Sequence, residues 1–183
     1  SPPTAGGMAT FQLNGKGRMD ISGAGTNPAI GSLSGTGPVF LGSRKLTTGR
    51  NLVSTFYSGL LQDGGINGGT GGSFAQVGSG TLTLSGANTY TGGTSLNGGT
   101  LKLINTAGSV TGTGAVQANA GNLGGNAIIA GPVTIGANNA DRPHLPPATA
   151  SQVLGPPTLQ SNIIFNYNGR SNHVLGAEDT ALP

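Results

Sequence analysis

The chain has 183 residues, of which 36 are glycine, 7% are charged and 4% are aromatic. An average globular domain is about 25% charged, so this composition argues against a large round core. The net charge of +3 is too low for the usual signature of disorder, and it is only a weak indication of nucleic-acid binding.

The first segment, residues 1–7, contains Pro2, Pro3 and the pair Gly6-Gly7. This composition predicts a flexible lead-in rather than a strand. The segment also lacks the charged start and apolar core of a signal peptide. We therefore expect either that a targeting segment has been removed or that the chain is an internal portion of a longer protein.

Residues 8–136 alternate short β-prone runs with turns rich in Gly and Asn. No helical periodicity competes with the two-residue period of these runs, and that period lets a strand bury one face and expose the other. The runs that predict strands are 10–13, 18–21, 39–41, 52–57, 81–84, 100–104, 115–117, 127–129 and 133–135.

The stretch from Gly78 to Ile104 is the most informative part of the chain. Leucines alternate with polar residues in Thr81–Leu84 and again in Thr100–Leu103, and Leu101 follows Leu82 by 19 residues. That offset is about one winding of a coil in which each strand lies over the previous one. The spacing therefore predicts stacked coils with a thin apolar column inside.

Turn dipeptides mark the corners of such a coil. Asn67-Gly68 and Asn97-Gly98 supply residues that adopt a positive φ with little strain. The same dipeptides also make ordinary hairpin turns, so an antiparallel sandwich or barrel remains an alternative.

The segment from Gly80 to Leu103 resembles the autotransporter-associated β-strand repeat, also called the passenger-associated transport repeat. More loosely similar flanks extend the resemblance to residues 30–136. The fold we expect is all-β, a right-handed parallel β-helix (β-solenoid) with a Pro-rich C-terminal arm. The residues that carry the repeat pattern are Gly80, Thr81, Leu82, Leu84, Asn88, Tyr90, Gly92, Gly93, Gly98, Gly99, Leu101 and Leu103.

Beyond Gly136 the sequence departs from the repeat. Residues 137–160 hold five of the eleven prolines and predict an extended linker, because proline cannot donate to a β-ladder. Residues 161–183 form the last predicted region, a terminal strand and tail. Its apolar residues Ile163, Ile164, Phe165 and Tyr167 indicate a last coil, a cap, or a strand that pairs with another copy and so supports self-assembly.

The sequence contains few residues that could form a catalytic or metal-binding site. The five carboxylates are Asp20, Asp63, Asp141, Glu178 and Asp179, and we interpret Asp20 and Asp63 as solvated turn residues rather than a pair acting on polysaccharide. His144 and His173 lie outside the repeat, and there is no cysteine, so we expect no metal site and no cofactor. The chain is predicted not to be an enzyme.

The resemblance implies a structural role outside the cell. We expect a secreted or cell-surface passenger or stalk segment, which supports export and display without catalysis. The alternative is a self-assembling subunit of an extracellular filament that donates its C-terminal strand to a neighbouring copy. Candidate partners are a homo-oligomer formed through the solenoid ends, an outer-membrane translocation barrel and surface polysaccharide, and we expect neither a nucleic-acid partner nor a membrane span.

Overall fold

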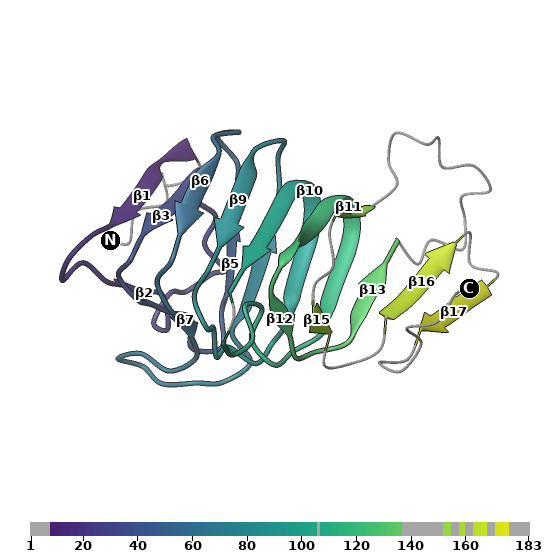
Figure 1. Ribbon diagram of the computed structural model, residues 1–183. Helices are drawn as coiled ribbons and strands as arrows, with labels where there is room; N and C mark the ends of the chain where they lie inside the picture. Colours follow the sequence, from purple (N-terminus) through teal and green to yellow (C-terminus); the bar gives the residue numbers. More distant parts are fainter. Residues whose placement is uncertain are drawn as a thin grey trace.

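The computed structural model describes residues 8–105 and 107–136, together with the backbone of four strands between residues 152 and 175. In these parts it is an all-β solenoid without α-helix, and the predicted fold class is confirmed. Each ladder between the described strands is parallel except the one between the last two, so the antiparallel sandwich or barrel is wrong. Figure 1 shows the strands stacked side by side along one axis.

The chain winds around three faces. The first face carries β1 (Thr10–Leu13), β3 (Ser32–Gly35), β6 (Thr55–Tyr57) and β9 (Thr81–Leu84), each paired with the next. It continues into the second halves of β10 (Thr94–Ile104) and β11 (Val116–Asn126). Five windings therefore separate β1 from β11.

The other two faces repeat the same arrangement. The second carries β2 (Met19–Asp20), β4 (Val39–Phe40), β7 (Leu61–Gln62) and later β12 (Ile128–Ile129). The third carries β5 (Lys45–Thr48) and β8 (Ser73–Gln76), then the first halves of β10 and β11, and β13 (Val133–Ile135). The hand of the coil stays a prediction.

The core is a column inside these three faces. Each winding contributes a few apolar side chains that point inward. The side chains of successive windings stack on one another because their strands are in register. Each of the following side chains is at most 2% exposed: Leu33, Val39 and Leu46 in one winding, Tyr57, Leu61 and Phe74 in the next, then Leu82, Tyr90 and Leu96, and Leu101, Val110 and Val116.

Several element boundaries differ from the sequence-based expectation. The strands β3, β5, β7 and β8 were not among the predicted runs. The strands β10 and β11 are longer than predicted because each turns a corner without leaving the sheet. The predicted strand 52–57 begins only at Thr55. Leu52 has a φ of 62°, a left-handed conformation that a β-strand does not accommodate.

The C-terminal region also differs in detail from an unpaired linker. Inside residues 137–160 the structure places β14 (Gln152–Leu154) beside β11, and β15 (Thr158–Leu159) beside β12. Both strands are short because Pro156 and Pro157 separate them. After them, β16 (Ile163–Tyr167) pairs in parallel with β13, and β17 (Ser171–Leu175) adds to it in the antiparallel direction.

Candidate functional site

The leucines of the repeat form the most regular part of the column. Thr81–Leu84 of β9 pairs residue by residue with Thr100–Leu103 of β10, so that Leu101 lies on Leu82 and Leu103 on Leu84. All four leucines are at most 2% exposed, whereas Lys102 between them is exposed. The 19-residue spacing in the sequence therefore corresponds to one winding.

Asn88 links three windings from inside the column. Its side-chain amide donates to the Val110 carbonyl oxygen at 2.6 Å, and its Oδ1 accepts from the Leu61 N–H at 2.8 Å. The side chain is 3% exposed, so both backbone groups lie where water does not reach them. The asparagine replaces ladder hydrogen bonds at a corner where no strand is present.

Tyr90 occupies the column next to Asn88 and is completely buried. Its hydroxyl is within hydrogen-bonding distance of Thr94 Oγ1, which is also buried. Burial raises the pKa of Tyr90 far above the usual range, although the hydrogen bond with Thr94 opposes this shift. Tyr57 of β6, the register partner of Leu84, is also completely buried and donates to the Gly37 carbonyl oxygen at 2.7 Å. Both tyrosines therefore serve as neutral packing residues.

The paired glycines of the repeat lie at the corners. Gly99 has a φ of 67°, and a Cβ atom there would lie 2.3 Å from the Gly80 carbonyl oxygen. Gly92 is equally constrained, since its Cβ would lie 2.1 Å from the Gly71 carbonyl oxygen. The remaining repeat residues, Gly80, Gly93 and Gly98, occupy similar corners where windings approach closely. These positions therefore require glycine, because any side chain would collide with the backbone of the neighbouring winding.

Asp20 does more than the solvated turn residue that we expected. Its Oδ2 accepts from the Ile66 N–H at 2.8 Å, and its Oδ1 accepts from Ser22 Oγ at 2.6 Å and Ser22 N–H at 3.0 Å. Ser22 Oγ in turn accepts from the Asn67 N–H at 3.0 Å. Partial burial raises the pKa of Asp20, but these hydrogen bonds and the charge of Arg18 outweigh it and hold the pKa below its ordinary value.

Asp63 fixes the other end of the same loop. Its carboxylate accepts from the Gly72 N–H at 2.9 Å, the Gly71 N–H at 3.2 Å and Thr91 Oγ1 at 2.6 Å. Asp63 and Asp20 thus hold residues 63–72, which we call the clamped loop, against the body of the solenoid. Both aspartates therefore do more than solvate a turn, because Asp20 accepts from the distant Ile66 N–H and Asp63 accepts from the Gly71 and Gly72 N–H groups and from Thr91 Oγ1.

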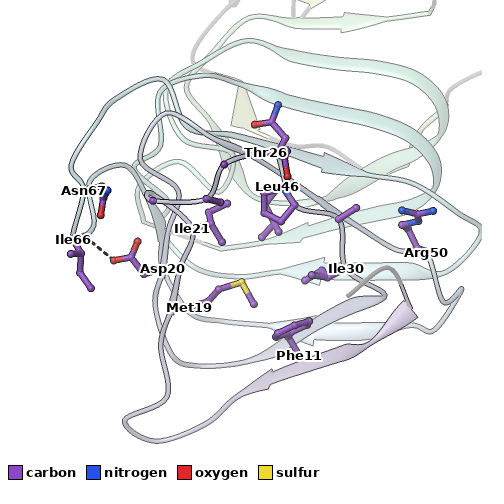
Figure 2. Close-up of a pocket in the computed structure, with 16 residues that line it drawn as sticks. Phe11, Met19, Asp20, Ile21, Thr26, Ile30, Leu46, Arg50, Ile66 and Asn67 are labelled. Carbon is purple, nitrogen blue, oxygen red and sulfur yellow. Dashed lines mark hydrogen bonds between the residues drawn. The ribbon is translucent and has the colours of Figure 1, made fainter. Parts of the chain in front are cut away.

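A pocket opens at the N-terminal end of the solenoid, with a volume of about 710 Å³. Its apolar lining includes Ile21, Ile30 and Leu46 of the inward column, together with Phe11 and Met19, which are partly buried and pack against that column. Figure 2 shows Arg50 at one side of this pocket and Ile66 and Asn67 of the clamped loop at the other, with Ile66 bonded to Asp20. The clamped loop therefore covers part of the end that the first winding leaves open.

The remaining predicted site residues lie in the C-terminal part. Ile163, Ile164 and Phe165 are in register with Val133, Thr134 and Ile135, and Tyr167 ends the same strand. Their role in self-assembly stays a prediction. His173 lies in β17, and His144 is outside the described residues. Among the described residues there is no group of three or more His, Cys, Asp and Glu side chains that could hold a metal ion.

Comparison with known families supports the identity of the repeat. The family model described as passenger-associated-transport-repeat matches residues 74–103, and this match confirms the resemblance seen in the sequence. No curated protein and no solved structure matches the chain. In the described part of the chain, no helix is long and apolar enough to cross a membrane.

Proposed function

We propose that this chain is a structural segment of a secreted or surface-displayed passenger, which supports export and display without catalysis. The observation that carries the proposal is the passenger-associated-transport-repeat at residues 74–103, in which the repeat residues form one winding of the buried column. The three-faced solenoid around it is the architecture expected of an elongated display element.

The mechanism follows from how a solenoid gains stability. Each new winding forms a ladder with the previous one and covers its inward side chains, so folding proceeds by addition at one end. A chain that emerges from a translocation pore can therefore fold stepwise on the outer side, and each completed winding hinders its return. The repeat is suited to this step because Asn88 bonds to the windings on both sides of its own.

A surface-display experiment tests this proposal with two adjacent residues of β10. Leu101→Asp places a charge in the column, whereas Lys102→Asp changes an exposed side chain of the same strand. In a fusion to an outer-membrane translocator, we expect Leu101→Asp to lower the amount of surface-exposed protein several-fold and Lys102→Asp to leave it unchanged. Equal export of the two variants would contradict a role for winding formation in export.

Self-assembly into an extracellular filament is the second candidate. The observation that favours it is the pair β1 and β2, each of which has a ladder partner on one side only among the described strands. Such open edges favour association with another chain. Deletion of residues 137–183, which include the predicted donor strand, should lower the oligomeric state, and an unchanged oligomeric state would exclude strand donation.

A further inference from the structure

The N-terminal end of the solenoid presents both backbone and apolar surface. On the described strands, the outward edges of β1 and β2 have no ladder partner, and the column ends in Phe11 and Met19, which are only partly buried. Ile66 of the clamped loop lies at the rim of the same end and is 79% exposed. An end of this kind can accept a further strand together with apolar side chains.

Charge is distributed unequally between the two ends of the chain. Five of the eight basic residues, Lys16, Arg18, Arg44, Lys45 and Arg50, lie between positions 16 and 50, where Asp20 is the single acidic residue. Lys16, Arg18 and Arg50 are exposed, and Arg50 lines the pocket. In contrast, residues 176–183 carry Glu178 and Asp179 and no basic residue.

The described strands nearest to these two segments lie at opposite ends of the stack. Figure 1 shows β1 at one end of the stack and β17 at the other, and the acidic residues directly follow β17 in the sequence. The strand β17 is the last strand of its sheet, so its outer edge also lacks a partner among the described strands. A surface and its complement on opposite ends of one molecule produce head-to-tail rather than two-fold contacts.

We infer that the N-terminal pocket, with Arg50 in its lining and the exposed Lys16 in the first winding, is a docking surface for the C-terminal end of a second copy, namely β17 and the acidic residues 176–183. The acidic tail lies against Lys16 and Arg50, and the edge of β17 extends the sheet of β1. This inference specifies the partner for the second candidate function, self-assembly, and is independent of the proposal on export. Repetition of the contact gives an open chain of copies.

Sedimentation of the purified full chain gives the first test. We expect the average mass to rise with protein concentration without reaching a fixed oligomer, because a head-to-tail contact does not close. We also expect association to weaken at ~0.5 M salt, where screening shortens the reach of exposed charges to a few ångströms.

Charge reversal tests the assigned surfaces. A head variant, Lys16→Glu with Arg50→Glu, places acidic side chains at both assigned contact positions, and a tail variant, Glu178→Lys with Asp179→Lys, places basic side chains at both. Each variant alone should associate about tenfold more weakly than the natural chain or worse, since like charges meet at the contact. A mixture of the two restores complementary ends and should associate again.

Lys102→Glu is the matched control, because it reverses an exposed charge on β10, away from both ends. It should associate like the natural chain, and circular dichroism checks that all variants retain their β-structure. A natural chain that stays monomeric at every concentration would overturn the inference. Undiminished association of the single variants, or no recovery in their mixture, would also overturn it.

Discussion

At the scale of single residues, buried polar side chains hold this solenoid together where strands are absent. Asn88 is the clearest case, since its amide group satisfies one backbone acceptor and one backbone donor in different windings. An unpaired buried backbone group costs about 1–3 kcal/mol, so a single side chain here prevents two such costs.

Asn88→Ala should therefore lower the free energy of unfolding by about 2–4 kcal/mol. Asn97 provides a control, because it is exposed and its Oδ1 accepts from the Asn119 side chain on the surface at 2.8 Å. Asn97→Ala should cost less than about 1 kcal/mol. Urea denaturation of both variants measures the difference, and equal losses would contradict the assigned role of Asn88.

Asp20 predicts a local dependence on pH. Its pKa in the folded chain lies below the ordinary value of 3.8, so the stability that its hydrogen bonds contribute is complete above that value. This stability is lost as the pH falls through the lowered pKa, because a protonated carboxyl group binds the Ile66 and Ser22 donors less well.

We expect the NMR signals of the Ile66 and Asn67 amides to shift together as acid is added, with a midpoint below pH 3.8. Asp20→Asn should abolish this titration, whereas Asp63→Asn should leave it in place, because Asp63 bonds to Gly71, Gly72 and Thr91 at the other end of the loop. A midpoint above the ordinary value would show that burial outweighs the hydrogen bonds.

At the scale of elements, the corners decide which glycines can be replaced. Gly99 and Gly68 both have a positive φ, of 67° and 64° respectively. An added Cβ atom at Gly99 would collide with the Gly80 carbonyl oxygen, whereas the space around Gly68 is open. The two positions therefore separate the conformational cost of a side chain from the cost of collision between windings.

Gly68→Ala should lower the free energy of unfolding by about 1–2 kcal/mol, the usual cost of the left-handed conformation. Gly99→Ala should cost at least about 3 kcal/mol, because overpacking adds to that cost. Thermal and urea unfolding of the pair measure the difference. Similar losses would mean that the corner at Gly99 can move away from β9.

The elements also show what sequence patterns can and cannot predict. The strand β9 and the second half of β10 were predicted because their leucines alternate with exposed residues. The strand β8 was not, because Phe74, Ala75 and Gln76 are all buried and no alternation remains. The hydrogen bond from Ile66 to Asp20 joins residues 46 positions apart, and no local signal encodes such a contact.

At the scale of the whole molecule, stability comes from contacts between neighbouring windings. In such an architecture the free energy is close to a sum of terms for single windings and for adjacent pairs. A whole winding can thus be removed while the others keep their neighbours, provided that the deletion preserves the register. The pairing of Leu101 with Leu82 defines that length as 19 residues in the repeat.

Deletion of residues 83–101 tests this directly, because it joins Leu82 to Lys102 and puts Lys102 in the place of its partner Thr83. We expect a shorter solenoid that unfolds cooperatively, with a smaller urea m value because less surface is exposed on unfolding. Deletion of residues 83–91 is the control, since it removes part of a winding and brings Gly92 to the position of Thr83. That variant should fail to fold, because Leu96 and Leu101 lose their register with the column, and a stable fold in both variants would mean that the windings do not depend on register.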